Sequence, residues 1–188
     1  MRAFLHVSLA PDAPAHLRRP VPAALDCLTD PDTTVDHIEQ TERGWLAGAG
    51  SEAGDRLPTT NGPFTVRLAR TARTRGSDVP TEALGPLLTA GTSALADFLP
   101  PFAAAHRAVP GGPVLIAGDW LGFRQLYRWT APGVAAVSTS ARALAVLAGG
   151  GFDPAGLGVQ ALIGWQIGDA TIFPGVTALP PATIATTP

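Results

Sequence analysis

The 188-residue sequence contains no lysine, one cysteine and few charged side chains, and each scarcity excludes a class of function. Arginine supplies all 13 basic residues, so a lysine nucleophile, a Schiff-base lysine and a P-loop lysine are excluded. The single cysteine, Cys27, excludes an intramolecular disulfide framework and a cysteine-based zinc cluster. The four histidines never occur at metal-ligand spacing, so we expect no metal site.

Long apolar runs and a large excess of charge are also missing. The net charge of −2 gives no reason to expect nucleic acid or an anionic membrane as a partner. No stretch approaches the roughly 20 uninterrupted apolar residues that span a bilayer. The opening apolar run of MRAFLHVSLAPDA is too short for a signal peptide. We therefore expect a cytoplasmic protein with no membrane or nucleic-acid partner.

Familiar catalytic motifs do not occur either. The glycine-rich stretch 48–54 lacks the Lys-Ser/Thr ending of a phosphate loop, and there is no Gly-x-Ser-x-Gly elbow. The context of Cys27, ALDCLTD, is typical of a small buried hydrophobic residue. The DHIE segment at 36–39 lacks the ligands for a catalytic zinc site and indicates a solvated polar face.

The residues that are present predict one α+β domain over 1–188. The sequence is 46% apolar and has 21 glycines and 19 prolines, which is typical of a folded chain with many turns. The stretch IAGDWLGFRQLYRW, 116–129, predicts a hairpin within a four-strand meander. Consecutive strands favour mainly antiparallel sheets. The expected strands are 3–9, 45–47, 64–68, 102–107, 114–117, 123–129 and 134–138. The expected helices are a short one near 23–28, then 81–99, 141–148 and 154–168.

Within that meander, four spaced residues match a family pattern. Asp119, Gly122, Leu126 and Tyr127 fit Asp-x-x-Gly-x-x-Pro-Leu-Tyr, with Gln125 at the usual proline. This pattern resembles the N-terminal glutaminase lobe of the asparagine synthetase family, a class II glutamine amidotransferase domain. Downstream, VAAVSTSARALA is similar to the strand-and-helix segment of that lobe, and TIFPGVTALPPA is similar to its closing motif. The resemblance implies that the four matched residues are structural.

Two upstream elements extend the resemblance. TTNGPF is similar to the family's Asn-Gly element, and RGSD is similar to the Gly-Ser-Asp element that precedes a helix. The resemblance implies that Asn61, Gly62 and Asp78 fall on the glutamine pocket. It covers residues 57–184 in the correct order, whereas residues 1–56 match poorly.

The resemblance further implies the fold of an N-terminal-nucleophile (Ntn) hydrolase, an αββα layered sandwich with mainly antiparallel sheets. Active members carry cysteine directly after the initiator methionine. Its thiolate attacks the glutamine side-chain amide, and its free α-amine accepts the proton. Here Arg2 stands at that position and offers no nucleophile. Arg43 is the nearest candidate for the arginine that grips the glutamine carboxylate, but its context differs. We therefore expect no catalytic residue and no cofactor in this chain.

These observations predict a non-catalytic glutaminase-like lobe of an ATP-dependent amide- or lactam-forming enzyme. Lasso peptide cyclases and β-lactam synthetases are family members that have lost the cysteine in this way. The partner would be the synthetase domain, in cis or in trans, which the sequence lacks. By resemblance, that domain binds ATP and magnesium and a peptide or small-molecule carboxylate substrate.

Two alternatives stay open. One is a stand-alone protein that binds a small ligand or peptide in the vacated glutamine pocket. The other is an amidohydrolase that exposes Cys27 or a hydroxyl residue after processing of its N-terminus.

Overall fold

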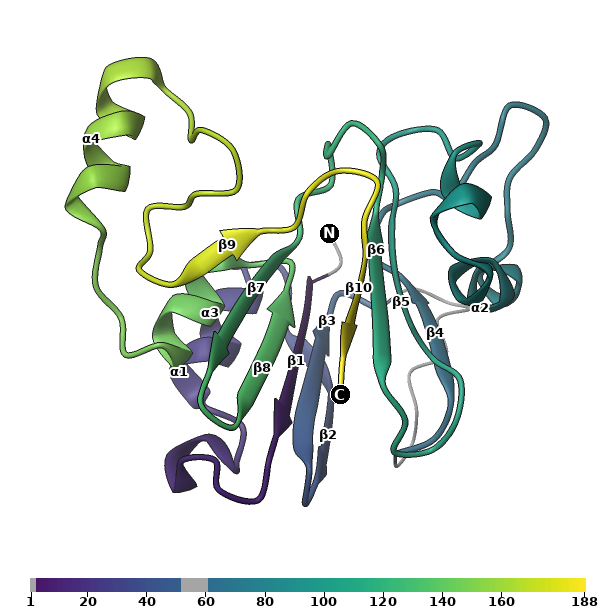
Figure 1. Ribbon diagram of the computed structural model, residues 1–188. Helices are drawn as coiled ribbons and strands as arrows, with labels where there is room; N and C mark the ends of the chain where they lie inside the picture. Colours follow the sequence, from purple (N-terminus) through teal and green to yellow (C-terminus); the bar gives the residue numbers. More distant parts are fainter. Residues whose placement is uncertain (1–2, 52–60) are drawn as a thin grey trace.

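Two antiparallel β-sheets form the body of the protein in the computed structural model, which describes residues 3–51 and 61–188 (Figure 1). The strand pairs of both sheets are antiparallel. With helices in separate stretches of the chain, this arrangement confirms the α+β class that the sequence predicts. Among the described residues, no helix has the length and apolarity needed to cross a membrane.

The larger sheet has six strands in the order β2-β3-β1-β8-β7-β9, and the smaller has four in the order β10-β6-β5-β4. The strands of the larger sheet are β1 (Ala3–Leu9), β2 (Val35–Thr41), β3 (Gly44–Ala49), β7 (Tyr127–Ala131), β8 (Val134–Ser138) and β9 (Val176–Ala178). Those of the smaller sheet are β4 (Phe64–Arg67), β5 (Ala103–Arg107), β6 (Val114–Gly118) and β10 (Ile184–Thr187). The α-helices in the described residues are α1 (Pro22–Leu25), α2 (Thr81–Ala90), α3 (Ala141–Leu147) and α4 (Pro154–Ile163).

Three apolar clusters hold these elements together. Between the sheets, Phe4 and Leu46 of the larger sheet pack with Phe64, Val66 and Ile116 of the smaller sheet. Helices α1 and α3 cover the other face of the larger sheet, where side chains from β1, β3 and β8 meet those of both helices. Helix α2 covers the outer face of the smaller sheet. The sheets therefore lie face to face, and each carries helices on its outer side (Figure 1).

Alternation along β1 explains its central place. Leu5, Val7 and Leu9 face the helices, while Phe4 faces the smaller sheet, so both faces of the strand are buried. Strand β1 is also internal within its sheet, because it pairs with β3 and β8. The predicted bounds of β1 and β8 match the structure, and β5 and β6 agree to within one residue.

The predicted hairpin at 116–129 is wrong. Strand β6 pairs with β5 and β10 in the smaller sheet, whereas β7 pairs with β8 and β9 in the larger sheet. Residues 119–126 carry the chain from one sheet to the other. The Gly-Asp turn signal was correct, but an inter-sheet crossing uses the same turn residues as a hairpin.

Two helices end earlier than the sequence predicts, and strand β2 was missed. Helix α2 stops before Gly91, whose φ of 103° cannot continue an α-helix, instead of reaching residue 99. Helix α4 stops at Ile163, because Gly164 adopts the left-handed conformation with φ 82°. The start of α4 agrees with the sequence, since the Asp153 carboxylate accepts a hydrogen bond from the Ala155 N–H.

Candidate functional site

Asp119 anchors the segment that crosses between the sheets. Its buried carboxylate accepts hydrogen bonds of 3.0–3.1 Å from four backbone N–H groups. Three of these belong to its own turn, at Leu121, Phe123 and Arg124, and the fourth is that of Phe102 before β5. Both carboxylate oxygens are thus satisfied by backbone donors, which fixes the path of the chain as it leaves β6.

The other three residues of the matched pattern also make structural contacts. Gly122 has φ 70°, and a Cβ there would lie 3.1 Å from Pro181 Cγ. Leu126 packs between the sheets, and its carbonyl accepts a hydrogen bond from the Leu179 N–H. Tyr127 begins β7 and donates its hydroxyl to Gln125 Oε1, and burial raises the pKa of the phenol. The four matched residues therefore stabilise the crossing, and two of them contact the 179–182 segment that packs against it.

A cavity of about 1660 Å³ opens between the sheets at the far end of β1 from this crossing. The strand register fixes its place, because Tyr127 pairs with Ser138 beside Leu5, whereas the cavity is lined by Ser8 and by Gly44 opposite it. We call it the inter-sheet cavity. Its polar lining residues are His6, Ser8, Glu39, Asn61 and Arg107, with Arg18, Arg19, Gln40, Thr41, Glu42 and Arg43 also bordering it.

A buried ion pair lies in the lining of the inter-sheet cavity. Arg107 Nη2 of β5 lies 2.8 and 3.1 Å from the two carboxylate oxygens of Glu39 on β2, and both side chains are 5% exposed. The guanidinium also donates from Nε to the Gly62 carbonyl at 2.9 Å and lies over the Phe64 ring at 5.0 Å. Arg107 therefore joins the edge of the larger sheet to the start of β4.

His6 lies beside this pair as a neutral imidazole. Burial first, and the positive charge of Arg107 second, lower its pKa from 6.5 to about 3. Its Nδ1 lies 2.9 Å from Thr187 Oγ1, and the same hydroxyl donates to the Val114 carbonyl at 3.3 Å. With a pKa of about 3, this imidazole is too weak a base to activate a hydroxyl near neutral pH.

The three residues that the resemblance assigns to a glutamine pocket lie on two segments, with Asn61 and Gly62 just before β4 and Asp78 between β4 and α2. Asn61 lines the inter-sheet cavity, where its Oδ1 accepts the Gly111 N–H at 3.1 Å, and Gly62 binds Arg107. Asp78 lies on the β4–α2 loop, where its exposed carboxylate is 3.7 Å from Arg73 Nε. Asp78 is not among the described residues that line the cavity with Asn61.

The candidate nucleophiles have separate outcomes. Arg2 and Met1 lie outside the described residues. Cys27 lies in a short 3₁₀ helix, Asp26–Leu28, and its thiol donates a hydrogen bond to the Ala23 carbonyl. Burial is the main cause that raises the pKa of this thiol. A raised pKa disfavours the reactive thiolate. Within residues 3–51 and 61–188, no group of three or more His, Cys, Asp or Glu side chains is placed to hold a metal ion.

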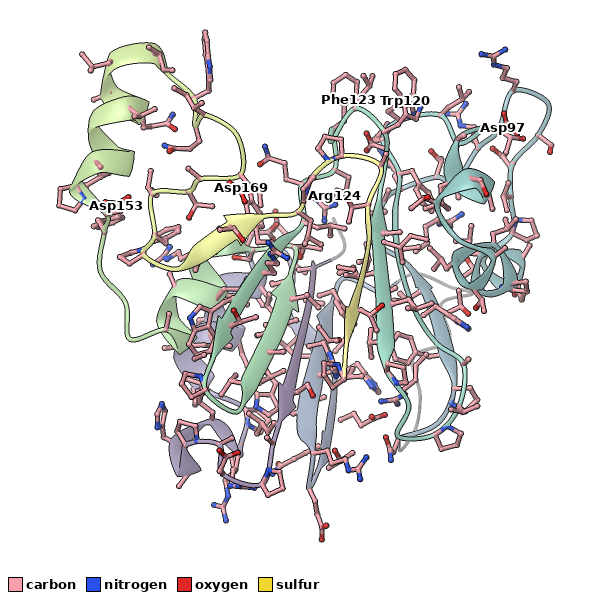
Figure 2. The ribbon with its side chains drawn as sticks, in the orientation of Figure 1. Asp97, Trp120, Phe123, Arg124, Asp153 and Asp169 are labelled. Atoms are coloured by element: carbon pink, nitrogen blue, oxygen red, sulfur yellow. The ribbon has the colours of Figure 1, made fainter. Side chains whose placement is uncertain are left out.

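Exposed apolar side chains are concentrated at the end of the molecule opposite the inter-sheet cavity. Three of them, Trp120, Leu121 and Phe123, are on the β6–β7 loop, and Figure 2 shows Trp120 and Phe123 at the outer edge of the molecule. The others lie on residues 154–168, which we call the α4 arm, namely Leu157, Leu162, Ile163, Trp165 and Ile167. We call these eight side chains the apolar end face; Leu162, Phe123 and Trp165 are 85%, 70% and 67% exposed.

The α4 arm is an unusual surface segment because it has no charged residue in fifteen positions. Gly156 is its one buried residue; a Cβ there would lie 2.7 Å from the Thr171 carbonyl. Near the end of the arm, Gln166 Nε2 donates hydrogen bonds to the Gly156 carbonyl at 3.1 Å and to Gln160 Oε1 at 3.0 Å. The arm is therefore internally braced, yet it leaves its apolar side chains in water.

A hollow of about 500 Å³ separates the β6–β7 loop from the end of the α4 arm. Its walls include residues of the crossing on one side and Gly168 and Asp169 on the other, closed by residues 178–181. Its charged lining groups, among residues 3–51 and 61–188, are Asp119, Arg124 and Asp169. Figure 2 shows Asp169 between α4 and the segment that carries Arg124.

Sequence reasoning missed the buried polar residues of the inter-sheet cavity. DHIE was interpreted as a solvated face, but it belongs to strand β2, whose alternation exposes Asp36 and Ile38 and buries Glu39. The clue was the period-two pattern of VDHIEQT next to the β3 strand. Nothing in the sequence alone paired Glu39 with Arg107, which is 68 positions away.

A scan against protein-family models found no match to this chain, and a search of curated proteins found none either.

Proposed function

We propose that this protein is a non-catalytic glutaminase-like lobe of an asparagine-synthetase-like enzyme that forms amide or lactam bonds with ATP. Its role is to pack against the synthetase domain, in cis or in trans. The face-to-face sheets with helices on their outer sides would correspond to the αββα sandwich of the Ntn hydrolases. The matched residues Asp119, Gly122, Leu126 and Tyr127 would have the same structural role as in that family.

The apolar end face carries this proposal. At roughly 200 Å² for a fully exposed large side chain, its eight residues leave on the order of 900 Å² of apolar surface in water. A stable interface buries about 800 Å² on each partner, so the apolar area on these two segments together is comparable with one side of such an interface. An uncharged helix such as α4 therefore indicates a surface that is covered in the working assembly.

The chemistry of the described residues supports a packing role over catalysis. The single thiol has a raised pKa, and the hydroxyl of Thr187 faces an imidazole that stays neutral down to about pH 3. Ammonia release from glutamine needs an activated nucleophile. An amide-forming enzyme whose amine comes from its own substrate has no use for that ammonia, which is why such a lobe can lose its nucleophile and persist.

The proposal is tested on the native protein, tagged and isolated from its producing cells under mild conditions. We expect the isolated assembly to bind Mg·ATP in a calorimetric titration, and we expect no glutamate release from L-glutamine. The recombinant 188-residue chain is the control and should do neither. Glutamine hydrolysis by the chain itself, or an assembly that does not bind Mg·ATP, would contradict the proposal.

A second candidate function rests on the inter-sheet cavity. A stand-alone protein could bind a small anionic ligand there, with Asn61 and the nearby arginines as polar contacts. The same isolation separates the two functions, because a stand-alone binder would be recovered as a monomer with a small molecule bound. In that case the variant Asn61→Ala would lose the ligand.

A further inference from the structure

The hollow beside the apolar end face has the charge of a receptor for one cationic side chain. Among the described residues, two carboxylates and one guanidinium line it, and their formal charges add up to −1. The Asp119 carboxylate is already occupied by four backbone N–H groups, and Arg124 Nε donates to the Leu68 carbonyl at 2.8 Å. The Asp169 carboxylate, in contrast, has no hydrogen bond or ion pair with any residue in the described part of the chain.

The two segments on either side of this hollow also carry exposed apolar side chains outside its lining. The β6–β7 loop presents Trp120 and Phe123, and the α4 arm presents Trp165 and Ile167 next to Asp169 in the chain. Interface hot spots are enriched in tryptophan, tyrosine and arginine and lie among neighbouring contacts that exclude water. Arginine is enriched at such positions because its planar guanidinium binds a carboxylate with two hydrogen bonds.

We infer that the apolar end face docks a segment of the synthetase domain that inserts one arginine or lysine into the hollow, where it pairs with Asp169. Apolar residues on either side of that cation cover the β6–β7 loop and the α4 arm. The inference rests on the proposed function, since it specifies the chemistry of the partner surface.

The charges argue against a second copy of this chain as the occupant. In a two-fold contact whose axis passes through the hollow, the carboxylate of Asp169 would approach the negatively charged hollow of the second copy. Arg124, the cation that lines the hollow among the described residues, already donates a hydrogen bond to a backbone carbonyl. A like-charge contact without solvent is unfavourable, whereas a cationic partner segment is complementary.

Hydrogen–deuterium exchange on the native assembly tests the inference, whether the synthetase domain is in cis or in trans. In the wild-type assembly, residues 119–125 and 154–168 should exchange at least roughly tenfold more slowly than in the isolated 188-residue chain. Asp169→Arg should abolish that protection, and Asp169→Asn should weaken it. The matched control is Glu42→Arg, which reverses an exposed charge at the opposite ends of the strands and should leave protection intact.

A second pair of variants tests the apolar part of the contact. Leu162→Asp places a charge on the most exposed residue of the face and should remove the protection, whereas Val109→Asp, at an exposed β5–β6 turn position, should not. Both positions are solvent-exposed in the isolated chain, so circular dichroism and thermal melts of the recombinant variants should match the wild type.

The outcomes separate this inference from the proposed function. If the assembly binds Mg·ATP but Asp169→Arg keeps full protection, the proposed function stands and the cation contact is refuted. If the wild-type chain is recovered without any ATP-binding partner, the proposed function itself fails. Reversible dimers of the recombinant chain that protect the α4 arm, and that Asp169→Arg leaves intact, would assign the face to a second copy and overturn the inference.

Discussion

Replacing Glu39 with glutamine removes one charge from the ion pair of the inter-sheet cavity and leaves its shape almost unchanged. The carboxylate lies 2.8 and 3.1 Å from Arg107 Nη2, and water reaches neither side chain appreciably. The variant therefore leaves a buried guanidinium facing a neutral amide. Removing one partner of a buried ion pair costs about 3–5 kcal/mol, because the remaining charge stays desolvated without compensation.

That cost is large for a protein of this size. Domains are stable by about 5–15 kcal/mol, and in a chain of 150–250 residues each kcal/mol changes Tm by about 2–4 °C. Glu39→Gln should therefore lower Tm by roughly 6–20 °C in a calorimetric scan. The matched control, Glu42→Gln, alters an exposed carboxylate near the same cavity and should change Tm by less than about 2 °C.

Two further variants measure how the pair is coupled. Arg107→Met should destabilise more than Glu39→Gln, since Arg107 also bonds the Gly62 carbonyl and covers the Phe64 ring. The double variant Glu39→Leu/Arg107→Met should be less destabilised than the sum of Glu39→Leu and Arg107→Met, because it leaves no unpaired charge. Equal melting temperatures for Glu39→Gln and Glu42→Gln, or strict additivity in the double variant, would refute the buried ion pair.

Three other residues give independent tests. Folded His6 stays neutral down to about pH 3, whereas the unfolded chain takes up a proton near pH 6.5, so stability should fall as the pH drops through that range. His6→Gln removes this contribution, so its free energy of unfolding in urea should change less between pH 7 and pH 4.5 than that of the wild type. An equal change in both proteins would contradict a buried neutral His6. Asp119→Ala should cost at least about 3 kcal/mol and speed amide exchange at 121–124, because four N–H groups lose their acceptor; unchanged exchange would count against the turn. Gly122→Ala should cost about 1–2 kcal/mol in urea unfolding because φ is positive there, whereas Gly158→Ala, which has open space and helical geometry, should stabilise; the reverse order would exclude the strained turn.

Local patterns predicted strand β1 and the starts of helices α3 and α4. The alternation in AFLHVSL gave β1, and Ser140, whose hydroxyl accepts the Ala143 N–H, marked the start of α3. The Asp153-Pro154 pair marked the start of α4 in the same way. Strand β2 was not predicted because it is an edge strand with one exposed face, so its charged residues resemble those of a solvated segment.

Relations between distant residues could not be predicted from the same patterns. A turn such as Gly118-Asp119 permits either a hairpin or a crossing between sheets, and only packing of Leu126 and pairing of β7 with β8 decide between them. The positions of Asn61 and Asp78 likewise depend on the path of the chain through β4, because Asn61 precedes this strand and Asp78 follows it. The exposure of the α4 arm depends on tertiary packing and could not be predicted from the sequence, because a helix of this apolar composition is typical of a protein core.

The native mass of the protein isolated from its producing cells tests the central claim most directly. The account predicts a mass tens of kilodaltons above the 19.3 kDa of this chain, whether the synthetase domain is covalently attached or bound as a separate chain. It also predicts that this larger species, and not the isolated lobe, increases in mass when Mg·ATP is added. A monomer of 19.3 kDa with the apolar end face uncovered would contradict the account.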